Sequence, residues 1–346
     1  MIIRTLTDAD ADVDRVLPLL PAGRIGVWAD ADAFRARLAT GEYRPEWTWL
    51  AEHEDGGEPC ALATWWGGPD DPLPAALDVL NVRDAEDSGA PDDAPGPADP
   101  RAPEDRRDTE AGDDSRTVLA VRLLTAAHSA FAEAGLDSPP DYHVLLPGDW
   151  RERSEAVAAL GWRREAARRA GLTASLERLR FEWTPETGVP RPSGRLRFRA
   201  EPDDEVFVDL FRRVLEGTLD AGSRSGAAAL GAERQARKDV AFYRDEMPGD
   251  RAWWRIAETP RGRPVGLALP SRNTSVHVVG YLGVLPEHRG RGYADDLLAE
   301  TTRFLAEEAG ADVVRADTDL ANTPMAAAFA RLGYRNFARR LVLSAP

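Results

Sequence analysis

Residues 276–298 read VHVVGYLGVLPEHRGRGYADDLL, and the rest of the chain can be arranged around them. The part up to Leu285 is apolar and rich in valine, which is typical of a β-strand. Pro286 ends this strand and begins a basic loop with glycine at 290 and 292. A helix follows, and one of its faces carries residues at helical spacing: Leu297, Leu298, Thr301, Phe304 and Leu305. We therefore predict a strand, a glycine-rich turn and a helix in succession.

This arrangement can hold a phosphate group. Gly290 and Gly292 let the backbone approach an anion closely, and the N-terminus of a helix favours negative charge. Arg289 and Arg291 add positive charge. An ordinary structural turn with incidental arginines is the alternative interpretation.

The same residues match a known motif. The order Arg-x-x-Gly-x-Ala (Arg289, Gly292, Ala294) directly after a Val-x-Pro strand end (Val284, Pro286) resembles the pyrophosphate-binding motif of the GNAT superfamily of acyl-CoA N-acyltransferases. The resemblance implies an α/β (α+β) fold in which a mixed, mostly antiparallel sheet is flanked by helices. It also implies acetyl-CoA as the co-substrate and no metal.

Length and composition limit the alternatives. At 346 residues the chain is long enough for two domains. The single cysteine, Cys60, excludes an intramolecular disulfide framework and favours a reducing compartment. No stretch approaches the roughly 20 apolar residues of a membrane span, and the start of the chain does not resemble a signal peptide. We expect a cytoplasmic protein, and the net charge of −15 disfavours nucleic acid as a partner.

A boundary between two domains is expected in residues 184–194, which are rich in proline and glycine. The predicted domains are 1–187 and 193–346. The second has the element order β-α-α-β-β-β-α-β-α-β-β, which resembles one complete GNAT domain. The first has a similar order, and its residues 159–164 parallel residues 331–336, each expected to close a short helix and open the terminal strands. The chain is therefore similar to a tandem GNAT protein with a degenerate first domain.

Residues 84–116 differ in composition from the rest. They contain twelve acidic and four arginine residues, many prolines and no aromatic residue. Such a segment cannot bury enough apolar surface to fold, so we predict a disordered insertion, with an acidic interaction tail as the alternative. The insertion takes the place of a pyrophosphate loop in the first domain. That domain is expected not to bind acyl-CoA, and to be structural or to close over the substrate cleft of the second.

Periodicity predicts the remaining elements. The strands expected in the first domain are 2–6, 47–52, 60–66, 77–82, 142–146 and 172–183. The helices expected there are 8–20, 117–135 and a short one at 154–160 that ends at Gly161. In the second domain we expect helices at 203–219 and 232–246 with a flexible loop at 217–231 between them, a hairpin of 252–258 and 264–269, a strand at 312–318, a short helix at 324–331 and a final strand pair in 334–344.

The resemblance assigns residues to the cofactor. Backbone groups of Leu282, Gly283 and Val284 would bind the pantetheine arm, with an N–H near Val284 polarising the thioester carbonyl. The loop would hold the pyrophosphate through backbone N–H groups from Arg291 to Ala294. Two more positions come from the following strand and helix: Asn322, either a cofactor contact or a helix N-cap, and Phe329. The full set of expected cofactor residues is Leu282, Gly283, Val284, Arg289, Gly290, Arg291, Gly292, Tyr293, Ala294, Asn322 and Phe329.

The catalytic residues are less well marked. Many family members have, at the position of Phe329, a tyrosine that protonates the departing thiolate, and phenylalanine cannot donate a proton. The glutamate that members often carry near Val278 or Gly280 is also missing. The candidates for the base are Tyr281, Asp319, His277, Asp317 or a chain of waters, and Tyr281 and Asp319 are the predicted catalytic pair. Each is also explained as an ordinary surface group.

The predicted function is acetyl-CoA-dependent N-acetylation of a primary amine of a small molecule, by direct transfer in a ternary complex. The substrate pocket is expected in 211–243 with Trp253 and Trp254, where Glu216, Asp220 and Asp245 could attract a cationic amine. The alternatives are a catalytically silent acyl-CoA-binding module, or a tandem-GNAT transferase that is mycothiol-synthase-like or aminoacyl-tRNA-dependent. A monomer or a homodimer, with no nucleic-acid and no membrane partner, is expected.

Overall fold

The computed structural model describes residues 1–7, 10–20, 25, 30–54, 57–83, 106–191, 193–273 and 275–346. These residues form two compact units. The first consists of Met1–Leu176 with Arg340–Pro346, and the second of Glu177–Arg339. Residues 177–187 thus group with the second unit and 340–346 with the first, whereas the domains expected from the sequence were 1–187 and 193–346. The assignment of domains stays a prediction.

The first unit contains five strands in the order β1-β2-β3-β4-β5, followed by the end of β12. Neighbours are antiparallel except β4 and β5, which are parallel. The bounds of its strands are β1 Ile2–Thr5, β2 Thr48–Glu52, β3 Pro59–Trp66, β4 Ala76–Val82 and β5 Asp141–Pro147. The bounds of its helices are α1 Asp10–Val16, α2 Ala31–Thr40, α3 Arg106–Glu133 and α4 Ser154–Arg169.

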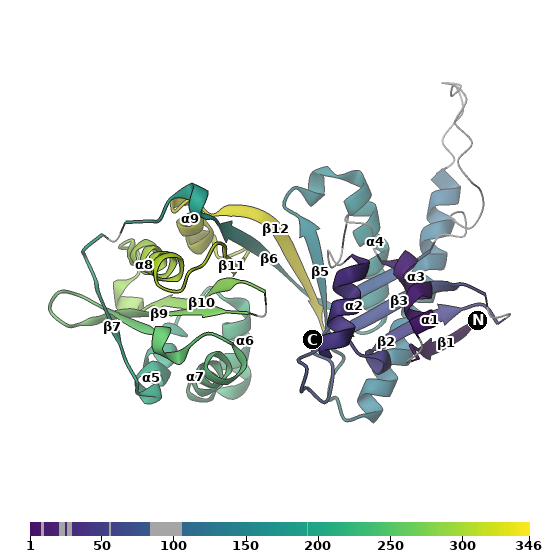
Figure 1. Ribbon diagram of the computed structural model, residues 1–346, viewed down its shortest axis with the longest axis horizontal. Helices are drawn as coiled ribbons and strands as arrows, with labels where there is room; N and C mark the ends of the chain where they lie inside the picture. The colour runs from purple at the N-terminus through teal and green to yellow at the C-terminus, as the bar shows by residue number, and fades with distance from the viewer. Residues whose placement is uncertain are drawn as a thin grey trace, which may run out of the picture. The chain divides into compact units, whose positions relative to one another are not determined.

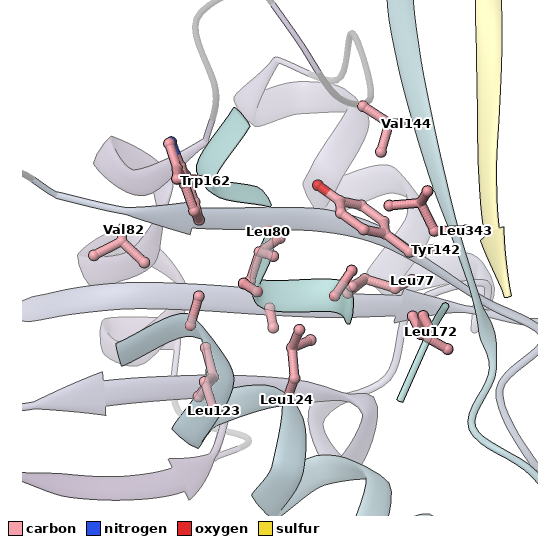
Figure 2. Packing of buried hydrophobic residues seen from close by; sticks show 14 of the residues in the cluster. Leu77, Leu80, Val82, Leu123, Leu124, Tyr142, Val144, Trp162, Leu172 and Leu343 are labelled. Atoms are coloured by element: carbon pink, nitrogen blue, oxygen red, sulfur yellow. The ribbon is translucent and has the colours of Figure 1, made fainter. Parts of the chain in front are cut away.

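Helices pack on both faces of these strands because apolar side chains alternate along them. Leu50, Leu62 and Val79 share one cluster with Val16 and Phe34 of the first two helices. The neighbouring positions face the opposite cluster, where β4 packs against α3 and α4. Figure 2 shows members of that cluster: Leu77 and Leu80 of β4, Tyr142 of β5, Leu123 and Leu124 of α3, Trp162 of α4 and Leu343 of β12.

The second unit has the strand order β12-β6-β11-β10-β9-β8-β7. The strands β10 and β11 are parallel, and the pairs β6–β11, β9–β10, β8–β9 and β7–β8 are antiparallel. The bounds are β6 Ala174–Trp183, β7 Arg197–Ala200, β8 Arg255–Glu258, β9 Pro264–Arg272, β10 His277–Val284, β11 Val314–Asp319 and β12 Arg335–Ser344. The helices are α5 Asp204–Val214, α6 Ala221–Leu230, α7 Ala232–Ala241, α8 Tyr293–Glu307 and α9 Thr323–Arg331.

In this unit α5, α6 and α7 lie on one side of β9 and β10, and α8 and α9 lie on the other (Figure 1). Phe207 and Phe211 of α5 pack with Leu267 and Leu269 of β9 on the first side. Leu298 of α8 and Phe329 of α9 pack with residues of β6 and β11 on the second. The expected fold class, a mixed and mostly antiparallel sheet flanked by helices, is confirmed. The strand β10 therefore has a helical layer on each face.

Four expected elements are corrected. The helix expected to end at Gly161 continues to Arg169 as α4, because Trp162, Ala166 and Ala167 are buried in the core at helical spacing. The parallel with residues 331–336 is therefore wrong for the helix end, since only Gly333 has a left-handed φ, +80°. The expected final strand pair is the single strand β12.

The loop expected at 217–231 is largely the helix α6. Asp220 caps it by accepting a hydrogen bond from the backbone N–H of Ser223 at 2.7 Å. Asp319 accepts from the N–H of Ala221 at 2.6 Å. In the expected insertion, residues 106–116 are the first part of α3, and 84–105 lie outside the described residues.

Candidate active site

A β-bulge interrupts β10 at Gly280. The register with β9 pairs Val279 with Pro270 and Tyr281 with Leu269, so that Gly280 has no partner of its own. Proline cannot donate a ladder hydrogen bond and is found in strands at edges and bulges. The carbonyl oxygen of Gly280 instead accepts a hydrogen bond from the Tyr243 hydroxyl at 3.0 Å.

The same strand has an open edge beyond the bulge. Among the described residues of β10 and β11, parallel pairing is confined to His277 with Val314 and Val278 with Arg315. The N–H of Leu285 donates to Val265 at 2.9 Å, toward β9. Because backbone groups of a strand point alternately to its two sides, the N–H groups of Leu282 and Val284 point away from β9. The strand thus presents free donors beside the bulge.

The N-terminus of α8 has no side-chain cap. Its N-cap is Gly292, which has a left-handed φ of +74° and no side chain to cap the helix. Gly290 is also left-handed, at +73°. Within the described part of the chain, the backbone N–H groups of Gly290, Arg291, Gly292, Tyr293 and Ala294 make no hydrogen bond to the protein. Five free donors at the positive end of a helix dipole are an arrangement that suits an anion.

Two arginines hold this loop by donating hydrogen bonds to backbone carbonyl oxygens. Arg289 donates to three carbonyl oxygens, of Val284 at 3.1 Å, Val214 at 2.7 Å and Glu216 at 2.6 Å. Arg195 donates to the carbonyl oxygens of Arg291 and Gly292 at 3.0 and 3.2 Å and to the buried carboxylate of Asp296 at 2.5 Å. The carbonyl oxygens of Arg291 and Gly292 therefore bond to the protein. The N–H groups of the loop remain available to a ligand.

Comparison with known families fits this geometry. The model of the acetyltransferase (GNAT) family matches residues 226–334, which include β10, the loop, α8 and α9. The chain carries a GNAT acetyltransferase domain. The expected enzyme class, N-acetyltransferase, is confirmed with it. A comparison with curated protein sequences finds no match for this chain.

Solved structures resemble the chain over nearly its whole length. A GCN5-related N-acetyltransferase from Sphaerobacter thermophilus has a TM-score of 0.55 at 15% identity, covering 99% of this chain and 94% of its own. A GCN5-related glucosamine N-acetyltransferase region of a fungal multi-domain β-N-acetylglucosaminidase has a TM-score of 0.52 at 13% identity, covering 99% of this chain and 38% of its own. At such identities the likeness concerns the fold alone.

The first unit repeats the strand geometry of the GNAT domain. In β4 the register with β3 skips Asp78, and parallel pairing with β5 is confined, in the described strands, to Ala76 with Asp141 and Leu77 with Tyr142. This resembles the bulge and departure of β10 from β11. The repeat supports the tandem arrangement inferred from the sequence.

In β4, however, an arginine side chain bonds to the strand edge that is open in β10. Arg163 of α4, only 4% exposed, donates to the carbonyl oxygen of Leu80 at 2.9 Å and to the side-chain oxygen of Asn81 at 2.8 Å. A third bond goes to the carbonyl oxygen of Ala159 at 2.8 Å. Within the described residues Arg163 makes no ion pair, and burial lowers its pKa. The backbone oxygen of Leu80, which corresponds in register to Leu282 of β10, is thus already occupied.

Two predicted cofactor residues have different surroundings. Asn322 stands at the N-cap position of α9, but its side chain makes no cap hydrogen bond and remains free to bind a ligand. Phe329 is 2% exposed and stacks on Phe181 at 4.8 Å between ring centroids. It is a core residue of the GNAT domain. Leu282 and Val284 are partly buried, Gly283 is buried, and Arg291 is exposed.

The predicted catalytic residues are constrained by their contacts. Asp319 is 1% exposed, and both its oxygens are engaged, one by Arg178 at 2.8 Å and one by the N–H of Ala221. Tyr281 packs on Phe211 at 4.5 Å, and burial raises its pKa, so it stays protonated. Of the other candidates, Asp317 pairs with Arg180 at 3.2 Å, and burial lowers the pKa of His277.

Two of the three acidic residues expected to attract an amine form ion pairs with arginines. Asp220 pairs with Arg178 at 2.8 Å in addition to capping α6, and Asp245 pairs with the adjacent Arg244 at 2.6 Å. Among the expected pocket aromatics, Trp254 is buried against Phe207, and Trp253 contacts His277.

One residue of the GNAT domain was missed by the sequence reading. Asp239 of α7 is partly buried, and its Oδ2 atom is buried with no hydrogen-bond partner in the described part of the chain. Charged residues on helices usually face water, and only the packing of α7 distinguishes this one. The described residues contain no cluster of His, Cys, Asp and Glu that could hold a metal ion. None of the described helices is both long and apolar enough to cross a bilayer.

Proposed function

We propose that the chain is an acetyl-CoA-dependent N-acetyltransferase that moves the acetyl group to a primary amine of a small molecule. Transfer is direct, in a ternary complex, and takes place in the GNAT domain. The observation that carries this proposal is the pair of open donor sets: five free N–H groups at the start of α8 and the unpaired edge of β10. The first set suits a pyrophosphate, and the second suits an amide-bearing arm that ends in a thioester.

The residues have distinct parts in the proposed reaction. Acetyl-CoA supplies an activated acetyl group and a thiol leaving group. The N–H of Val284, directed away from β9, is placed to stabilise the oxyanion that forms when an amine attacks the thioester. Phe329 cannot protonate the departing sulfur. A thiol has a pKa of about 8.5, so a thiolate can depart without an acid at that position.

We propose one active site per chain. In the first unit Arg163 occupies the backbone oxygen of Leu80, where an incoming pantetheine arm would need to bind. The corresponding oxygen of Leu282 accepts no hydrogen bond from a side chain among the described residues. This contrast supports acetyl-CoA binding by the second unit alone.

The test is calorimetric titration of acetyl-CoA into the wild type, Gly292→Glu and Gly310→Glu. Both glycines have nearly the same left-handed φ, +74° and +72°, so the backbone strain of substitution is matched. Only Gly292→Glu places a carboxylate among the free donors of α8. We expect one site in the wild type, loss of binding in Gly292→Glu, and retained binding in Gly310→Glu. Equal binding by all three proteins would refute the assigned loop, and two sites per chain would refute the silent first unit.

A non-catalytic acyl-CoA-binding module is the second candidate. It is favoured by Phe329, which offers no proton, and by Asp319, whose oxygens are both engaged. Acetyl-CoA binding without acetylation of any amine in a broad panel would support this candidate over the enzyme.

A further inference from the structure

Three residues of α7 and its continuation form a row that leads to the bulge of β10. Gln235, Asp239 and Tyr243 are four residues apart, so their side chains lie one above another on one face of the helix. The side-chain amide of Gln235 donates to Oδ1 of Asp239 at 2.7 Å. The hydroxyl of Tyr243 donates to the carbonyl oxygen of Gly280. Asp239 is therefore oriented by a buried amide, one helical turn from the side chain that contacts the bulge.

The second carboxylate oxygen of Asp239 lacks a donor. Its Oδ2 is buried without a hydrogen-bond partner among the described residues. Arg178, which bonds to the neighbouring Asp220, is already engaged, because it donates to Asp220 and Asp319 at 2.8 Å each. A buried carboxylate oxygen is costly to leave unpaired, and such groups often have a catalytic or ligand-binding role. This oxygen therefore retains an unused acceptor position.

Aromatic rings pack around Tyr243 and include Tyr281 of β10. Tyr281 of β10 lies 4.5 Å from Phe211 and 6.0 Å from Tyr243, measured between ring centroids. Phe211 and Tyr243 stack at 6.2 Å. The faces of such rings attract cations, most strongly where water is excluded. Tyr281 directly precedes Leu282, where the open edge begins. A cation held beside Asp239 and these rings would lie near the strand proposed to bind the thioester.

We propose that Asp239 binds the ammonium group of the acceptor and takes its proton as the general base of acetyl transfer. The acceptor is then a cationic primary amine. This inference rests on the proposed function. Asp239 would supply a base that the predicted catalytic pair does not: Tyr281 stays protonated because burial raises its pKa, and Asp319 is held by Arg178 and Ala221.

Proton transfer to Asp239 precedes acetyl transfer. The ammonium gives one proton to the Asp239 carboxylate and becomes a neutral amine. Its nitrogen attacks the thioester carbonyl carbon, and the carbon–sulfur bond breaks as the tetrahedral intermediate collapses. A second proton passes from nitrogen to the thiolate. The products are the acetamide and coenzyme A thiol, and Asp239 then releases its proton to solvent.

The protonation state of Asp239 is consistent with this role. The pKa of Asp239 is raised to about 6: burial is the largest cause and Asp220 also raises it, while Gln235 and Lys238 lower it. The other titratable groups that act on this region are Arg178, Tyr243, Tyr281 and Arg289. Burial raises the pKa of both tyrosines, so neither becomes an anion near neutral pH. Asp239 is ionised at pH 7 and still basic enough to accept a proton.

The test compares the wild type with Asp239→Asn, Asp239→Glu and the control Asp209→Asn. Asp209 is an exposed carboxylate of α5 that pairs with Arg212 on the same helix. The first measurement is the Kd of acetyl-CoA, which we expect to be equal in all four proteins. The second is kcat/KM between pH 5 and 9 with benzylamine, tyramine and cadaverine. The third is calorimetric binding of benzylamine, with benzyl alcohol as its neutral counterpart.

A general base contributes typically 10²–10⁴-fold. We expect Asp239→Asn to lose at least 100-fold in kcat/KM. The rise of kcat/KM with pH near pH 6, expected for the wild type, should also be absent from this variant. Asp239→Glu should recover part of the rate, and Asp209→Asn should match the wild type. Benzylamine should bind the wild type more tightly than Asp239→Asn, and benzyl alcohol should not distinguish them. An Asp239→Asn enzyme with unchanged rate and pH profile overturns the inference.

The two proposals fail in different ways. If the wild type binds no acetyl-CoA, the proposed function fails, whatever Asp239 does. If acetyl-CoA binds but no amine of the panel is acetylated, the calorimetric comparison decides the role of Asp239. Benzylamine binding that Asp239→Asn does not weaken, or no benzylamine binding at all, then overturns the inference.

Discussion

The hydroxyl of Tyr243 donates to the carbonyl oxygen of Gly280 at 3.0 Å. This contact joins the end of the α7 segment to the residue that β9 leaves unpaired. A bulge frees backbone groups from the ladder, and each freed group needs another partner. In this protein the partner is a side chain from the helical layer. The contact therefore couples the position of α7, with Asp239, to the shape of β10, the strand proposed to bind the thioester.

Tyr243→Phe should destabilise the protein by about 1 kcal/mol, because it removes one hydrogen bond and retains the packed ring. Urea denaturation followed by tryptophan fluorescence measures the change. Tyr293→Phe is the control, since the Tyr293 hydroxyl makes no hydrogen bond to the described residues. Equal midpoints for the two variants would show that the Gly280 oxygen is satisfied without Tyr243.

Arg289 and Arg291 should differ in what their loss affects. Arg289→Met removes three hydrogen bonds to carbonyl oxygens, so we expect about 2–3 kcal/mol of lost stability in the free protein. Arg291 is exposed and lies among the free donors. Arg291→Met should leave stability unchanged and weaken acetyl-CoA binding, with the difference from wild type shrinking at high salt. Thermal unfolding and calorimetry at two salt concentrations separate the two roles.

Phe329→Tyr should not create the missing acid. The ring is buried between Phe181 and Tyr334, so the added hydroxyl would enter a core without a prepared partner. Burying an unpartnered hydroxyl costs about 1–3 kcal/mol. We expect reduced stability and no rise in kcat. Phe242→Tyr, at a position 40% exposed, is the control and should be neutral. A higher kcat for Phe329→Tyr would mean that this ring reaches the thioester.

His128 of α3 should make the first unit sensitive to acid. Burial lowers the pKa of His128 to about 4, whereas an unfolded histidine titrates near 6.5. Between these values the unfolded state binds more protons, so stability falls as the pH falls from 6.5 to 4. His128→Gln should remove up to about 3 kcal/mol of this dependence. Denaturation at several pH values tests it, with the exposed His53→Gln as the control.

The strand–turn–helix core of the site could be predicted because its signals are local. Valine runs, Pro286, the glycines and the helical spacing after residue 292 each act within a few residues. The continuation of α4 past Gly161 could not be predicted in this way, since it depends on Trp162 packing in a core assembled from other elements. The helix α6 was missed because its serines and glycines favour a loop. Its N-terminus is held by Asp319, far away in the sequence.

The same limit applies to the site residues. Sequence places Asp239 on a helix but does not show that one of its oxygens is buried. Arg163 is one of many arginines in the chain, and nothing near it in the sequence indicates that it fills the edge of β4. Both roles arise from side chains that fold onto backbone groups of distant strands. Motifs locate the loop proposed to bind the cofactor, and only packing distinguishes Asp239.

The N–H groups without partners at the N-terminus of α8 allow ligand binding to be followed by hydrogen exchange. Amides that are not hydrogen-bonded exchange their hydrogen with solvent quickly, whereas those in the β9–β10 ladder exchange slowly. The amides from Gly290 to Ala294 should therefore exchange within seconds in the free protein. A bound pyrophosphate would slow these five and leave Asp295, whose N–H already bonds to Gly292, nearly unchanged. Deuterium uptake along one short peptide would then follow ligand occupancy without any label or substrate turnover.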